Sequence, residues 1–170
     1  MSERLRVHLR LIDSAVAPVV ERYREHIECR AGCGDCCHQT FRVSEIEGEL
    51  LREGLATLDA TTRDDILARA RGYTPDVREP CPVLSSEGAC RMYEYRPRIC
   101  RKYGIPLWQP DRPHEVSTCP KNFRRTPDID GELILEPQAE WARDWIRLRA
   151  ELGLGPTVKS TIAELLRKKG

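Results

Sequence analysis

The cysteines of this chain are concentrated in one window of the sequence. All eight lie within residues 29–119, and the first four are crowded into Cys29-Arg-Ala-Gly-Cys33-Gly-Asp-Cys36-Cys37. Thiolates are soft ligands for zinc and iron–sulfur clusters, and close spacing lets one turn present several to one metal. The sequence therefore predicts a metal site in this window, with eight candidate ligands: Cys29, Cys33, Cys36, Cys37, Cys81, Cys90, Cys100 and Cys119.

A disulfide framework is the competing interpretation of eight cysteines. Secreted disulfide scaffolds are usually smaller than 170 residues, and the N-terminus has no unbroken apolar stretch typical of a signal peptide. The adjacent pair Cys36 and Cys37 could bridge each other only through a strained ring. These features favour a metal site in a cytoplasmic protein, where thiols stay reduced unless metals bind them.

Charge and hydropathy exclude two classes of partner. The formal net charge is only +1, with both signs scattered along the chain, so no basic field points to nucleic acid. No run approaches the ~18 apolar residues of a membrane span. We expect no nucleic acid and no membrane as partner, and an unknown protein as partner or substrate.

Apolar periodicity predicts helices on both sides of the window. Spacings of three or four residues from Leu5 to Ile27 indicate one helical face, in which either the helix kinks at Pro18 or a new helix starts at residues 13–14. The spacing Trp141, Trp145, Leu148, Leu152 indicates another helix. A weaker helix is expected over residues 161–169.

Shorter elements are expected between these helices. A capping box at residues 44–47 predicts a helix to about residue 52, residues 61–71 predict another, and Pro97 could start one that carries Cys100. Residues 81–84 and 89–93 could form a short hairpin around a turn, and residues 131–135 a brief strand. Residues 106–127 look irregular because they are rich in proline.

The expected fold is mainly α, a single small domain with an irregular, metal-organised cysteine-rich centre and one short β-hairpin. The domain spans residues 1–170, its metal-binding core residues 29–119, and its helical flanks residues 5–28 and 137–169. Aromatic residues make up 6% of the chain, so the apolar core is thin and a bound metal would add stability.

Spacing alone leaves the metal and its ligand set open. Eight thiolates could form two four-thiolate sites, one site with spare thiols, or a binuclear site. Structural zinc prefers two short Cys-x2-Cys pairs, but only Cys33 and Cys36 form one here. A [4Fe–4S] cluster tolerates long gaps between its ligands. The spacing therefore favours an iron–sulfur cluster, with zinc as the alternative.

Two resemblances to known families bear on the cysteine run. Cys29-x3-Cys33-x2-Cys36 is similar to the signature of radical S-adenosylmethionine enzymes, but those place it after a strand in a large partial barrel, and this chain lacks the strand–helix alternation. The fuller pattern, Cys-x3-Cys-Gly-x-Cys-Cys, then Cys81-Pro-x-Leu, then Cys90-x2-Tyr93-x2-Arg96-Pro97-x2-Cys100-Arg101, resembles the YkgJ-type cysteine-cluster family.

The YkgJ-type resemblance implies a zinc- or iron-chelating domain. The family string is Cys-x2-Cys-x2-Cys-Cys, whereas three residues fill the first gap here. Arg96 and Arg101 belong to the similar segment, and we expect them to contact the cofactor or neutralise its charge.

Three functions remain open from the sequence. The first is a metal-binding module that serves in electron transfer, in sensing or as an accessory subunit. The family also includes flagellin lysine N-methylases, so the second is an S-adenosylmethionine-dependent protein lysine methyltransferase, although no pocket signature for that cofactor is present. The third is a zinc-stapled interaction domain. No catalytic residue is assigned.

Overall fold

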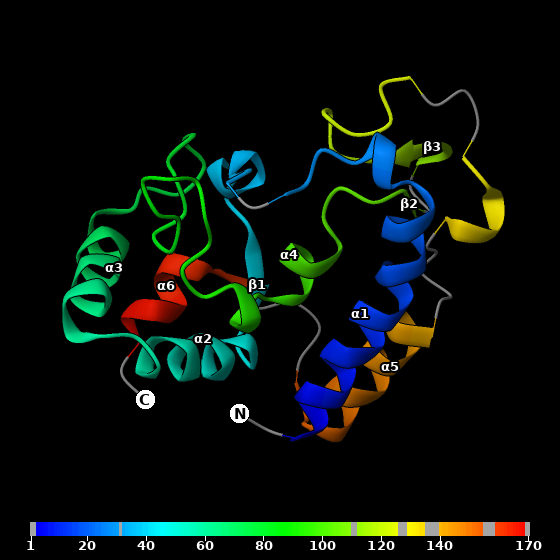
Figure 1. The fold of residues 1–170 in the computed structure, drawn as a ribbon. Helices are drawn as coiled ribbons and strands as arrows, with labels where there is room; N and C mark the ends of the chain where they lie inside the picture. The colour runs from blue at the N-terminus through cyan, green and yellow to red at the C-terminus, as the bar shows by residue number, and fades with distance from the viewer. Residues whose placement is uncertain are drawn as a thin grey trace. The chain divides into compact units, whose positions relative to one another are not determined.

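The computed structural model describes residues 3–30, 32–109, 112–125, 129–134, 140–154 and 159–168 of the chain (Figure 1). Helices dominate this part, joined by short strands and loops, so the expected mainly α class is confirmed. Contacts divide the chain into two compact units. The first comprises Arg30–Cys100 and Pro156–Gly170 together with Met1, and the second comprises Ser2–Cys29 and Arg101–Gly155.

The first unit is built around helix α6 (Ile162–Arg167), which packs against α2 (Glu47–Ala56) and α3 (Ala60–Gly72). Strand β1 (Arg42–Ser44) pairs antiparallel with β4 (Lys159–Thr161), with Val43 opposite Ser160. This pairing ties the C-terminal segment to the chain just after the cysteine run. Two segments that are distant in sequence are thereby held side by side.

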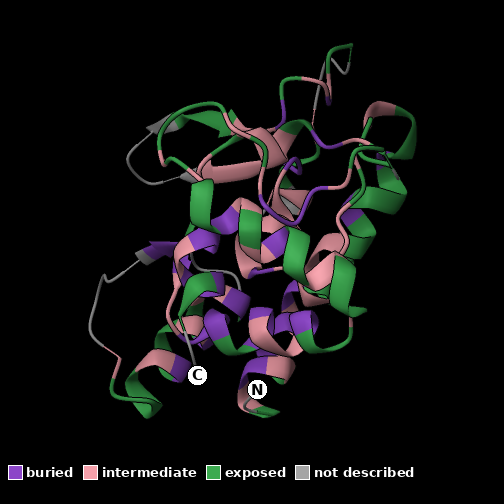
Figure 2. Cartoon of the chain, turned by 90° about the vertical axis from the view of Figure 1, so that its left-hand side faces the viewer, coloured by how far each residue is buried: buried purple, intermediate pink, exposed green. Residues whose placement is uncertain are grey.

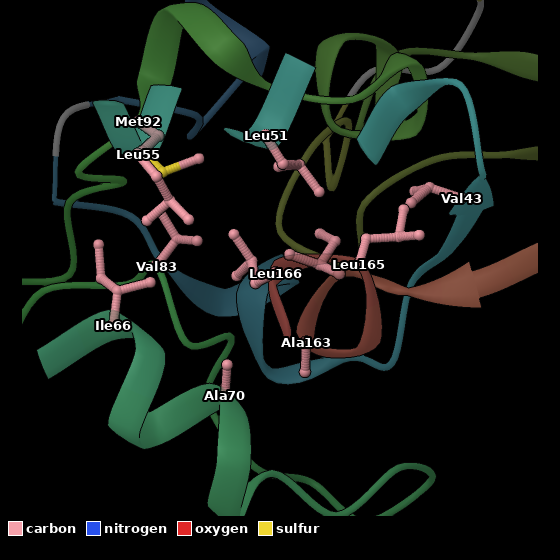
Figure 3. Close-up of a cluster of buried hydrophobic side chains, with 11 residues drawn as sticks. Val43, Leu51, Leu55, Ile66, Ala70, Val83, Met92, Ala163, Leu165 and Leu166 are labelled. Carbon is pink, nitrogen blue, oxygen red and sulfur yellow. The ribbon is translucent and has the colours of Figure 1, made fainter. Parts of the chain in front are cut away.

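Apolar side chains from these helices converge on one core (Figure 3). Leu51 and Leu55 of α2 meet Leu165 and Leu166 of α6, and Ile66 of α3 is fully buried beside them. Fully burying one such side chain contributes about 2 kcal/mol, so these few contacts matter in a thin core. Val83 joins the same cluster from within the loop between Cys81 and Cys90, and Met92 joins it just after this loop, so the loop is anchored to the core.

Local capping sets where these helices begin. Thr161 accepts a hydrogen bond from the Glu164 amide, and the Glu164 carboxylate accepts one from the Thr161 amide, which completes a capping box. Asp59 caps α3 by accepting from the Thr62 amide at 2.9 Å. Helix α6 therefore starts where the sequence predicts, and α3 starts close to the expected residue.

The second unit centres on α1 (Glu3–Arg22) and α5 (Glu140–Glu151), which lie side by side (Figure 1). Each helix has buried residues on one side and exposed residues on the other (Figure 2). Leu5 and Leu148 are fully buried, as the apolar periodicity predicts, whereas Leu152 lies beyond the end of α5 and is 42% exposed. Pro18 lies inside α1 without ending it. Among the described residues, no helix is both long enough and apolar enough to cross a membrane.

The sheet elements differ from the sequence expectation. A hairpin forms from β2 (Leu107–Gln109) and β3 (Arg112–Ser117), inside the segment expected to be irregular. The hairpin expected at residues 81–93 is reduced to one antiparallel bridge between Leu84 and Cys90. The predicted strand at residues 131–135 is wrong, because Gly131–Leu133 forms a 3-10 helix, and residue 135 lies outside the described residues.

Helix boundaries also differ in places. The proposed capping box at residues 44–47 is only half formed, because Ser44 belongs to β1 while its amide donates to Glu47 at 2.9 Å. The predicted helix carrying Cys100 is confirmed as α4 (Arg98–Lys102), directly after Pro97. The C-terminal flank predicted over residues 137–169 contains α5, β4 and α6, and its residues 137–139, 155–158 and 169 lie outside the described residues.

A buried carboxylate joins the two long helices of the second unit. Asp144 of α5 is 5% exposed and accepts hydrogen bonds from the Arg4 guanidinium at 2.5 and 3.0 Å. Its Oδ2 also lies 2.8 Å from Nδ1 of His8, which is fully buried. The Arg4 guanidinium, followed by the His8 ring, holds the pKa of Asp144 below its usual value, although burial opposes this.

Replacing this carboxylate should destabilise the helix pair. We expect Asp144→Asn to lower the free energy of unfolding by about 2 kcal/mol, because a charge-assisted hydrogen bond is lost in a buried position. Since the folded-state pKa is depressed, the contribution is present above about pH 4 and is lost as the pH falls through the folded-state value. Urea denaturation at neutral and acidic pH measures both effects.

Glu151→Gln is the matched control for this experiment. Glu151 also accepts from Arg4, at 3.0 Å, but its side chain is 53% exposed. We expect a change below about 0.5 kcal/mol, since exposed ion pairs contribute little. Equal losses in the two variants would contradict the role given to the buried carboxylate.

Candidate metal centre

Most of the cysteines belong to the first compact unit. They come from three segments: the 3-10 helix η2 (Asp35–His38) and the residues before it, the loop that contains the Leu84–Cys90 bridge, and α4. The six cysteines in this unit are Cys33, Cys36, Cys37, Cys81, Cys90 and Cys100.

Backbone hydrogen bonds order the first two segments. The Cys81 amide donates to the Cys37 carbonyl at 2.6 Å, which joins the loop to the cysteine run, and the Arg91 amide donates to the Val83 carbonyl at 3.1 Å within the loop. Arg69 of α3 adds a third restraint, because its guanidinium donates to the carbonyl of Leu84 and, at 3.2 Å, to that of Cys81. A helix side chain thereby fixes a loop that has almost no regular structure of its own.

Two glycines allow the cysteine run to approach this loop closely. A Cβ at Gly88 would lie 2.5 Å from the Gly32 carbonyl oxygen, and Gly88 has a φ of +77°. A Cβ at Gly34 would lie 2.9 Å from a methyl carbon of Leu84 and 3.2 Å from the Gly88 carbonyl oxygen. Any side chain at position 88 would therefore collide with backbone and also adopt a strained conformation.

The third segment is positioned by a buried glutamate. Glu47 of α2 is 2% exposed, and its carboxylate accepts from the Arg98 amide at 2.7 Å and from the Ser44 amide at 2.9 Å. It therefore fixes the first turn of α4, which carries Cys100. The sequence showed Glu47 only as part of a capping box, because its second partner lies 51 residues along the chain.

Electrostatic interactions link four thiols pair by pair. Cys36, Cys81, Cys90 and Cys100 each interact with the other three. Burial, helped by the neighbouring thiols, raises the pKa of Cys81 to about 11 and also raises the pKa values of Cys90 and Cys100. Thiolates in this group would repel one another unless a cation lay among them.

Cys36 and Cys37 are not equivalent. The Cys37 thiol donates a hydrogen bond to the Cys36 sulfur, which lowers the pKa of Cys36 to about 7 and raises that of Cys37. A hydrogen bond to the charged form of a group favours that form. Of the two neighbours, Cys36 is therefore the better thiolate ligand.

The two arginines singled out by the sequence have different surroundings. The Arg96 guanidinium stacks 3.4 Å from the centre of the Tyr93 ring and donates to the Tyr93 carbonyl at 2.8 Å. Its charge also acts on Cys36 and Cys90, where it lowers the thiol pKa. Arg101 belongs to the second unit and forms an ion pair with Asp13 at 2.5 Å. Contact of either arginine with a cofactor remains a prediction.

The remaining two cysteines, Cys29 and Cys119, belong to the second unit. Cys29 is exposed and Cys119 is buried. Both lie beside Gly104, and Asn122 donates a hydrogen bond to the Cys29 sulfur at 3.5 Å. The three-residue gap after Cys29 already set this cysteine apart from the family string, but nothing in the sequence set Cys119 apart, since spacing does not report which compact unit a residue joins.

The donor set of the first unit fits a thiophilic metal by its chemistry. The four thiolates would repel one another, and their removal from water makes an uncompensated negative charge unfavourable. The positive charge of Arg96 attracts two of them, Cys36 and Cys90. Among the described residues, no three His, Cys, Asp or Glu side chains are already spaced to hold a single ion.

A cavity opens beside the cysteine run. It has a volume of about 520 Å³ and is lined in part by Gly34, Asp35 and His38 from the run and by Asp65 and Arg91. Asp65 and Arg91 form an ion pair at 2.5 Å. This volume falls within the range of small-molecule pockets, so solvent or a small molecule can reach the cysteine run from this cavity.

Fold and site together define a small, mainly α protein whose cysteine-rich loops carry the donor atoms that a thiophilic metal prefers. A family model described as "CxxCxxCC: Putative zinc- or iron-chelating domain" matches residues 28–122, more than half of the chain. The chain belongs to this family, as the sequence resemblance indicated. The comparison with curated proteins and the comparison with solved structures each give no significant match.

Substitution of Gly88 tests whether its close approach to Gly32 shapes the metal site. We expect Gly88→Ala to lower both the melting temperature and the metal content, because its Cβ would force the 81–90 loop away from the cysteine run. Thermal unfolding and metal analysis on the same sample measure the two quantities. Gly72→Ala is the matched control, since a Cβ there meets nothing within 4 Å, and it should change neither. Full metal content in Gly88→Ala would show that the docking of these loops does not shape the site.

Proposed function

We propose that the chain is a metal-binding module that holds a [4Fe–4S] cluster and serves in electron transfer, in sensing or as an accessory subunit. The observation that carries the proposal is the set of four thiols in which every pair interacts. These are Cys36, Cys81, Cys90 and Cys100. A [4Fe–4S] cluster takes one thiolate per iron, which matches four ligands.

Ligand spacing supports iron–sulfur over zinc. The four thiols come from residues 36, 81, 90 and 100, so they contain no Cys-x2-Cys pair. Structural zinc sites are typically assembled from two such pairs, whereas iron–sulfur clusters accept long gaps. When bound, the cluster would supply one-electron chemistry.

The chain's own residues would tune such a centre. Cys37 donates a hydrogen bond to Cys36, and Arg96 places a positive charge near Cys36 and Cys90. Hydrogen bonds to sulfur, net charge and solvent exposure set the potential of iron–sulfur centres. In this proposal Cys36 is a ligand and Cys37 supports it.

Anaerobic purification with metal and sulfide analysis tests the cofactor. We expect a brown protein with about four irons and four sulfides per chain. A colourless protein with stoichiometric zinc, which unfolds when a chelator removes the metal, would contradict the iron–sulfur proposal and support the zinc-stapled alternative.

Two serine variants test the ligand assignment on that protein. We expect Cys90→Ser to abolish cluster binding, because it removes one of four thiolates. Cys37→Ser should retain about four irons per chain, because in this proposal Cys37 is not a ligand and the serine hydroxyl can still donate to the Cys36 sulfur. Retention of the cluster in Cys90→Ser, or its loss in Cys37→Ser, would show that the ligand set is different.

A further inference from the structure

The two cysteines of the second unit converge on one point. Gly104 has a φ of +96° and no side chain. A Cβ built on it would lie 3.2 Å from the Cys29 sulfur and 3.4 Å from the Cys119 Cβ. The lack of a side chain at Gly104 therefore lets both cysteine side chains pack against its backbone. Neither is part of the four-thiol set described above.

Asn122 organises this space. The residue is 4% exposed, and its side-chain amide donates to the Gly104 carbonyl at 2.7 Å and to the Cys29 sulfur at 3.5 Å. Its amide oxygen accepts from the Glu28 backbone at 2.9 Å, and its own backbone amide donates to the Cys119 carbonyl at 2.9 Å. Asn122 thus contacts both cysteine-bearing segments, with its side chain on Gly104 and the Cys29 segment and its backbone amide on Cys119.

The two thiols differ in access to solvent. Cys29 is exposed, whereas Cys119 is 7% exposed. A donor to sulfur favours the thiolate, which is the reactive form of cysteine. An exposed thiol with such a donor next to a buried second thiol is the arrangement of an attacking and a resolving cysteine.

We propose that Cys29 and Cys119 form a redox-active thiol pair that closes to a disulfide when Cys29 reacts with hydrogen peroxide. The Cys29 thiolate attacks the terminal oxygen of the peroxide, the O–O bond breaks, and Cys29 becomes a sulfenic acid while hydroxide leaves. The Cys119 sulfur then attacks the Cys29 sulfur, the S–O bond breaks, and water leaves. Overall, two thiols lose two electrons and two protons, and one peroxide is reduced to two waters. A dithiol reductant reverses the disulfide by exchange.

Peptide mapping of the full metal-loaded chain tests this proposal. Trypsin places Cys29 in residues 25–30 and Cys119 in residues 103–121, and each of these peptides contains a single cysteine. After one equivalent of hydrogen peroxide, we expect the disulfide-linked pair of these two peptides as the main product. In Cys119→Ser, the sulfenic acid should persist on Cys29 and be trapped by dimedone.

Two controls separate this proposal from the function proposed for the first unit. The same oxidation in urea should lose its selectivity, because Cys29 then meets Cys33, Cys36 and Cys37 more often than Cys119. Cys29→Ser and Cys119→Ser, without oxidant, should keep the full metal content of the parent protein. Loss of metal from either variant would make that thiol a metal ligand and overturn the proposal. Linkage of Cys29 to residues 31–42 in the folded chain, or no modification of Cys29, would also overturn it.

Discussion

The contact on which the metal centre depends is the close approach between the cysteine run and the loop from Cys81 to Cys90. The Cys81 amide donates to the Cys37 carbonyl at 2.6 Å, and the lack of a side chain at Gly88 allows it to pack against Gly32. Without this approach, η2 and the loop would not bring their thiols into one electrostatic group. Bringing four half-buried thiols together is unfavourable for their charged forms, and a bound cation would make it favourable.

The supporting structure is anchored outside the loops. Arg69 of α3 binds two carbonyls of the loop, Glu47 of α2 fixes the start of α4, and Met92 enters the core formed by α2 and α6. Each anchor is a side chain from a helix or from the hydrophobic core. Contacts with these regular elements therefore fix the conformation of the irregular segments. Metal binding and folding of this unit are therefore expected to be coupled, as in other small metal-binding domains.

The sequence predicted the helices whose formation depends on residues close together in the chain. Apolar periodicity identified α1 and α5, and Thr161 and Pro97 marked the starts of α6 and α4. It did not predict the pairing of β1 with β4, because three-residue strands are too short to show alternation and their partners are more than 100 residues apart. Ser44 looked like a helix cap but lies in β1, since strand pairing overrides the local signal. For the site, spacing identified all the thiols but not their division between the two units, nor the roles of Glu47 and Asn122, which depend on distant partners.

X-ray absorption spectroscopy at the metal edge of the purified protein tests the central claim most directly, because it identifies the atoms bound to the metal. Here the claim is that cysteine sulfurs from the first unit form the whole protein ligand shell. We predict a shell of sulfur alone, with iron–iron scattering if the metal is a cluster. A shell dominated by nitrogen or oxygen would contradict the claim, since the thiols brought together by these loops would then not be the ligands.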